Sequence, residues 1–149
     1  DDYAPCIALA TKAVEAKRDD RQFLNTLGAI LYRAGQLQEA VKRLTELDGR
    51  LDDSGSGAPS SPAYTWYVLA MAHHKLGQQD NAKKYVMKAN ARTEQELADS
   101  IQSLPWNRRL TLQSLRKEAE AIITPGKPSV QPAAKVEKES PKEEPKEKP

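Results

Sequence analysis

The amino-acid sequence predicts an all-α protein built from antiparallel helical hairpins. Only 38% of its 149 residues are apolar and 30% are charged, which favours a thin, well-solvated helical body. Apolar residues recur every three or four positions, the spacing of one helix face. A pattern of large and small residues also occurs twice, each member of the second copy lying 42 positions after its counterpart. The paired residues are Leu24 and Trp66, Leu27 and Leu69, Gly28 and Ala70, Gly35 and Gly77, and Ala40 and Ala82.

The first half of the chain is expected to contain one lone helix and one full hairpin. Residues 5–18 form the lone helix, the second half of a repeat, because Ile7 and Val14 share helical spacing. Residues 21–54 form the first repeat, with Asp19 or Asp20 as its N-cap. Gly35 suits the left-handed position that ends a helix, and an antiparallel partner helix follows it. The Gly-, Ser- and Pro-rich stretch 52–60 is expected to be a loop.

The second repeat is expected over residues 63–92, with Ser61 as N-cap and Pro62 in the first turn. Thr93 and Glu96 have the spacing of a capping box, which predicts a new helix or a bend. Residues 93–123 are therefore predicted to form capping helices, and residues 1–123 one helical domain. Residues 124–149 are rich in Pro, Lys and Glu and are predicted to be a disordered tail, because they hold too little apolar surface to fold.

The charge and composition of the chain do not point to one particular class of partner. The formal net charge is +2 with both signs interspersed, so no polyanion is required. The one cysteine, Cys6, excludes an intrachain disulfide and is expected to be a small buried residue. No apolar run approaches the length of a membrane span, and the first residues lack the pattern of a signal peptide. We therefore expect a cytoplasmic protein, present here as a fragment of a longer chain.

The repeated pattern resembles the tetratricopeptide repeat family, which implies a superhelical array of helical hairpins. Small Gly28 and Ala70, with Ala40 and Ala82 opposite them, permit close approach of the paired helices. The positions that carry the resemblance are Leu24, Leu27, Gly28, Leu31, Ala40, Leu44 and Leu47 in the first unit and Trp66, Leu69, Ala70, His73, Ala82, Val86 and Ala89 in the second. The segments 25–35, 69–74 and 106–109 more narrowly resemble repeats in large bacterial proteins that also carry a serine/threonine kinase or a WD40-type propeller.

The resemblance implies that the first helix of each unit lines a concave groove. Tyr side chains there offer contact area and a hydroxyl, Met adapts its shape, and Arg33 and Lys75 can pair with a carboxylate. The predicted peptide-binding residues are Asn25, Ala29, Tyr32, Arg33, Tyr67, Met71, His74 and Lys75. The alternative is that these positions pack against a neighbouring domain of the same parent chain.

No catalytic motif, phosphate loop or cofactor motif is recognisable in the sequence. His73 and His74 are adjacent and so point about 100° apart on a helix, which is unsuited to chelating one metal ion. The function expected is therefore a non-catalytic, cofactor-free scaffold that binds a peptide or a sibling domain. The alternatives are a nucleic-acid-binding helical module, through the basic pairs 83–84, 108–109 and 116–117, or a regulatory appendage of a protein kinase.

Overall fold

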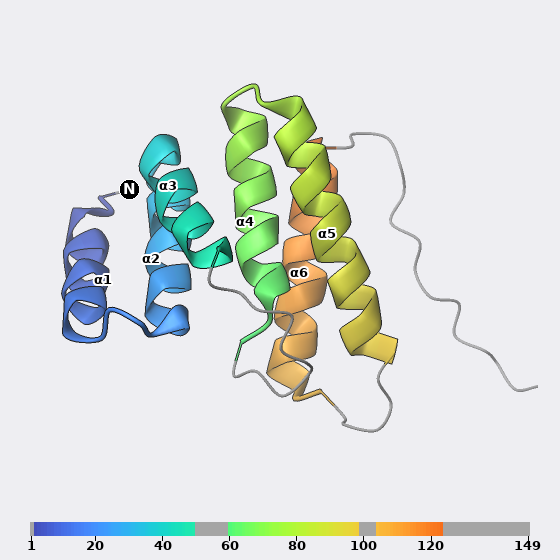
Figure 1. The fold of residues 1–149 in the computed structure, drawn as a ribbon, viewed down its shortest axis with the longest axis horizontal. Coiled ribbons are helices and arrows are strands. Elements are labelled where there is room, and N and C mark those ends of the chain that lie inside the picture. Colours follow the sequence, from blue (N-terminus) through green and yellow to red (C-terminus); the bar gives the residue numbers. More distant parts are fainter. Residues whose placement is uncertain (1, 50–59, 99–103, 124–149) are drawn as a thin grey trace, which may run out of the picture.

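The computed structural model describes residues 2–49, 60–98 and 104–123, and in these ranges every regular element is an α-helix, as the sequence predicts. The predicted loop at 52–60, apart from Ser60, and the predicted tail at 124–149 lie outside the described residues. Figure 1 shows α1, α2 and α3 at one end of the molecule and α4, α5 and α6 at the other. The helices are α1 (Ala4–Ala16), α2 (Arg21–Arg33), α3 (Leu37–Asp48), α4 (Pro62–Lys75), α5 (Gln79–Ala98) and α6 (Trp106–Ile123).

The two hairpins, α2–α3 and α4–α5, turn in the same way. Gly35 and Gly77 both adopt φ +77°, a left-handed conformation that glycine reaches without steric cost. The N–H that follows each glycine donates back to the carbonyl five residues earlier, from Gln36 to Leu31 and from Gln78 to His73, at 2.9 Å in both cases. The sequence repeat at the turn is therefore also a repeat of backbone geometry.

The predicted helix starts are confirmed at α2 and α4. The Asp20 carboxylate accepts from the backbone N–H of Gln22 at 2.9 Å, and Ser61 Oγ accepts from Ala63 N at 3.1 Å. These bonds satisfy backbone donors that have no partner within the first turn of a helix. Both hairpins thus begin at a side-chain cap that the sequence identifies.

Helix α4 is the centre of the molecule, because it contacts α2, α3, α5 and α6. Every residue from Thr65 to His73 is buried. A helix that is apolar on all sides fits only where neighbours surround it. The core therefore sits along α4, and each other helix contributes one apolar face to it.

Small residues bring the hairpin helices together, as predicted. Ala70, Ala40 and Ala82 are fully buried, and Gly28 lies in the interior of α2. The side chain closest to Gly28 is Leu44, however, rather than the expected Ala40. Leu44 lies one turn further along α3, and the glycine leaves the space that its side chain fills.

No new helix starts at residues 93–96, because α5 runs through them unbroken. The two polar residues that suggested a capping box make tertiary contacts instead. Thr93 Oγ1 lies 3.0 Å from the Tyr67 hydroxyl, and the Glu96 carboxylate accepts from Ser61 Oγ at 2.9 Å. Burial against α4 supplies partners that the sequence pattern could not identify.

Cys6 also differs from the prediction, since it is exposed on α1. The residue of α1 that is buried is Ala10, and Leu9 is 72% exposed. Because α1 packs against α2 alone, only one face of α1 is covered. Within the described ranges, none of the helices combines the length and the apolar character that crossing a bilayer requires.

Candidate functional site

The α4 part of the predicted groove face is covered by α6. Figure 1 shows α6 lying along α4 and α5, and the Tyr64 hydroxyl of α4 donates to the Arg108 carbonyl at 3.4 Å. Tyr67 and Met71, which were expected to line an open groove, are both 0% exposed. That expectation was wrong for these two residues, because a further helix occupies the space in front of them.

Arg33 is the groove residue whose partner is most clearly defined. Its two terminal nitrogens donate to the two carboxylate oxygens of Glu118 on α6, each at 2.6 Å. Such a two-point contact holds a carboxylate in one orientation. The hydrogen bond to Glu118 raises the pKa of the Arg33 guanidinium. Arg33 was expected to pair with a carboxylate of a peptide ligand, and in the structure Glu118 of α6 occupies it instead.

Tyr32 and Lys75 are associated across the helices at the same end of the groove. Lys75 Nζ lies 4.4 Å from the centroid of the Tyr32 ring, close enough for a cation–π contact, and Arg33 lies 5.5 Å from it. Tyr32 is only 2% exposed, so it does not offer the open surface that was expected. His74 is half-buried beside Lys75 on α4.

Asn25 and Ala29 lie further toward the start of α2. Ala29 is half-buried and packs against the core, while the Asn25 side chain accepts from Thr65 Oγ1 of α4 at 3.2 Å. Asn25 also borders a polar cleft of about 470 Å³ between the first turns of α2, α4 and α6, whose lining residues include Tyr64 and Arg108. The eight predicted residues thus lie on α2 and α4, but they do not form one open groove.

The α4 side of this buried face is strongly hydrogen-bonded. The Tyr67 hydroxyl donates to Asn90 Oδ1 at 2.8 Å, and Asn90 in turn donates to Glu120 of α6 at 3.2 Å. Arg116 of α6 contacts Glu120 at 2.9 Å and Glu94 at 3.2 Å. Burial raises the pKa of Tyr67 to about 12, so the hydroxyl stays protonated near neutral pH.

A second set of charges joins α4, α5 and α6 near their other end. The Glu96 side chain is 1% exposed and contacts Arg92 at 2.8 Å and Arg108 at 3.0 Å. Together with Ser61 it forms a nearly dry network, in which each buried charge depends on its partners. This network positions the first turn of α6 against the start of α4.

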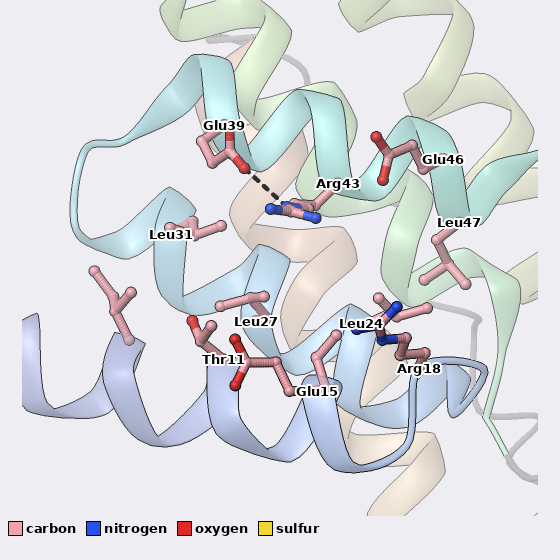
Figure 2. Close-up of a pocket in the computed structure, with 12 residues that line it drawn as sticks. Thr11, Glu15, Arg18, Leu24, Leu27, Leu31, Glu39, Arg43, Glu46 and Leu47 are labelled. Carbon is pink, nitrogen blue, oxygen red and sulfur yellow. Dashed lines mark hydrogen bonds and ion pairs between the residues drawn. The ribbon is translucent and has the colours of Figure 1, made fainter.

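A second cleft lies between α1 and α3. Figure 2 shows this cleft, with α2 as its floor. Its volume is about 520 Å³. The lining residues are Ile7, Thr11, Val14, Glu15, Arg18, Leu24, Leu27, Leu31, Glu39, Arg43, Glu46 and Leu47.

Leucines form the floor of this α1–α3 cleft and charged residues form its rim. Leu27 and Leu31 are below 5% exposed, so only small parts of them reach the cleft. Arg43 and Glu39 pair at 2.8 Å on the α3 side, and Figure 2 shows Thr11 and Glu15 of α1 pointing toward the α2 leucines. The sequence had identified these leucines only as hairpin packing residues, because periodicity does not reveal that α1 and α3 stand apart above them.

Within the described ranges, no three His, Cys, Asp or Glu side chains gather closely enough to hold a metal ion. His73 is instead a packing residue, stacked on Tyr85 with ring centroids 5.5 Å apart. The chain matches no protein-family profile, and no curated protein or solved structure is detectably similar to it.

Proposed function

We propose that this chain is a non-catalytic protein–protein interaction scaffold of the tetratricopeptide type, and that its open binding surface is the α1–α3 cleft. The observation that carries this proposal is the combination of an apolar leucine floor and a rim of both charges. A partner in the cleft would remove from water the apolar surface that its lining still exposes, and a mixed rim selects the partner by its charge pattern.

The shape of the cleft favours an amphipathic helix or an extended segment as the partner. The cleft runs between α1 and α3 above the leucines of α2, so it can accept apolar side chains spaced along one face. Glu15 and Glu46 on the rim would attract lysine or arginine next to these apolar side chains. Arg18 would attract a carboxylate at the end of the cleft.

A protein partner is favoured over a nucleic acid by the state of the basic clusters. Arg108 and Arg116 are held by glutamates of the same fold, at 3.0 Å and 2.9 Å respectively. Binding a phosphate there would require breaking these pairs, which are partly shielded from water. Lys83 and Lys84 stay exposed, but two lysines supply a weak phosphate-binding surface.

Selection from a displayed library of helical peptides tests this function. The whole chain should enrich peptides with apolar residues at helical spacing, with micromolar affinity. Thr11→Trp places a large ring in the cleft and should weaken the selected peptides at least tenfold. Thr45→Trp, the same substitution at an exposed α3 position outside the cleft, should leave them bound.

Two results would contradict the proposal. One is enrichment of no peptide above background. The other is a selected peptide whose affinity is equal for the wild type and for Thr11→Trp. Binding to oligonucleotides that falls steeply with salt would instead support the nucleic-acid alternative.

A further inference from the structure

Helix α6 is attached to the rest of the fold by a narrow apolar stripe and a set of ion pairs. Its fully buried residues are Leu112 and Ala119, while Leu115 and Ile122 are only partly buried. Its outer face is exposed, with Trp106 at 79%. By contrast, α4 is buried on all sides. The contribution of charged contacts is therefore larger for α6 than for the central helix.

These charged contacts match the chemistry expected of a bound partner. The receiving face carries the Arg33 guanidinium on α2, with the Lys75 ammonium near it on the Tyr32 ring. Helix α6 carries Glu118 opposite Arg33, and its buried Leu112 and Ala119 belong to the same apolar core as Tyr67 and Met71 of α4. An apolar stripe with one carboxylate is how an amphipathic peptide helix would occupy this face.

We propose that α6 is a displaceable ligand of this face within the same chain, and that the face accepts in its place a partner helix with an apolar stripe and a carboxylate at the position of Glu118. The face is built by α2, α4 and α5, and is separate from the α1–α3 cleft. Because α6 is tethered, its effective concentration is on the order of millimolar, so a free helix competes only when it binds tightly or when α6 is loosened.

The experiment loosens α6 without changing the receiving face. Glu118→Arg places a second positive charge opposite Arg33 and removes the two-point contact. Glu39→Arg is the matched control, because Glu39 also pairs with an arginine at the surface but lies on α3, away from α6. Amide hydrogen exchange is measured for residues 106–123 and, as an internal reference, for 21–48.

Exchange in 106–123 should rise roughly fivefold to tenfold in Glu118→Arg, the size expected for losing a well-oriented surface ion pair and gaining a repulsion. Exchange in 21–48 should stay unchanged. The control should leave 106–123 unchanged, and any rise should be confined to α3, where Glu39 and Arg43 lie. Combining Glu118→Arg with Arg33→Glu reverses the pair and should return exchange in 106–123 to the wild-type rate.

A labelled synthetic peptide of residues 104–123 then probes the uncovered face. It should bind the Glu118→Arg chain roughly fivefold to tenfold more tightly than the wild type or the control, in proportion to the rise in the open state. The same peptide carrying Glu118→Arg should bind it only weakly. Three results would overturn the proposal: equal exchange of α6 in Glu118→Arg and Glu39→Arg, a rise that extends equally to 21–48, or a loosened α6 without peptide binding. The first two would make α6 a fixed part of the core.

Discussion

Gly28 of α2 lies directly beneath Leu44 of α3, so closely that a Cβ on the glycine would come within 2.5 Å of Leu44 Cγ. Real side chains do not approach to this distance. Leu44 is fully buried, so it could move away only by displacing its neighbours in the core. The contact between these two residues therefore sets the spacing of the first hairpin.

Gly28→Ala should destabilise the protein, although alanine is the better helix former. Overpacking a core costs about 1–3 kcal/mol, whereas the helix gains only about 0.5–1 kcal/mol from alanine. We expect a net loss of about 1–2 kcal/mol in the free energy of unfolding, measured by urea denaturation. Gly49→Ala is the control, because the nearest atoms lie 3.8 Å away, and it should be neutral or slightly stabilising. Equal effects at both sites would refute this interpretation.

The second hairpin suggests how to relieve the overpacking that Gly28→Ala would cause. At the positions equivalent to Gly28 and Leu44 it carries Ala70 and Val86. Alanine is larger than glycine and valine is smaller than leucine, so the two changes compensate each other in volume. Leu44→Val combined with Gly28→Ala should therefore be more stable than the sum of the two single changes by about 1 kcal/mol. A double-mutant cycle in urea measures this coupling. Strict additivity would show that the two hairpins do not share this packing rule.

Glu96→Gln should be strongly destabilising. The neutral amide leaves two arginines without their shared charge in a nearly dry environment, and breaking a buried pair costs about 3 kcal/mol or more. Glu94→Gln serves as the control, since Glu94 is 65% exposed and its pair with Arg116 is worth less than about 1 kcal/mol. Thermal or urea unfolding compares them. Similar losses for the two variants would mean that water reaches Glu96.

Alkaline pH should destabilise the fold through Tyr67. Its pKa rises from 10 in the unfolded chain to about 12 in the fold, because burial disfavours the phenolate. Below pH 10 both states hold the proton, so the contribution of Tyr67 to stability is fully present. Above pH 10 the unfolded state ionises first, and stability falls by up to about 1.4 kcal/mol per pH unit until the folded state also ionises.

Tyr67→Phe should make this alkaline loss shallower, while costing about 1–2 kcal/mol at neutral pH because Asn90 and Thr93 lose a partner. Urea unfolding from about pH 8 to about pH 11 measures both effects. Burial also raises the pKa of Tyr64 and of Tyr85, so the variant should retain part of the slope. An unchanged slope would mean that Tyr67 does not titrate differently in the two states.

The arrangement of helices within each hairpin could be read from the sequence because it depends on local rules. Asp20 and Ser61 cap their helices within three residues, Gly35 and Gly77 end theirs through a backbone conformation, and Gly28 lies on a face defined by helical spacing. Each of these signals acts between neighbours in the chain. The prediction failed at Thr93 and Glu96, where polar residues look the same whether they cap a new helix or bind distant partners.

In the candidate site, too, local sequence features could be predicted, whereas contacts between distant segments could not. The sequence predicted that Arg33 binds a carboxylate of a peptide ligand. It did not reveal the pair with Glu118, because the two residues are 85 positions apart. The all-round apolar character of α4, from Trp66 to Ala72, was a signal that this helix is enclosed, and it would have excluded Tyr67 and Met71 from an open groove.

The sequence by itself determined that the chain forms helical hairpins, where they turn, and which small residues let their helices touch, since spacing along a helix fixes which residues share a face. Only the tertiary structure decided which faces stay open. It placed α6 over the expected groove and left the α1–α3 cleft uncovered. A face is buried when packing it gives a more favourable free energy than every competing arrangement of the chain. That comparison involves contacts between segments far apart in the chain, which no local pattern encodes.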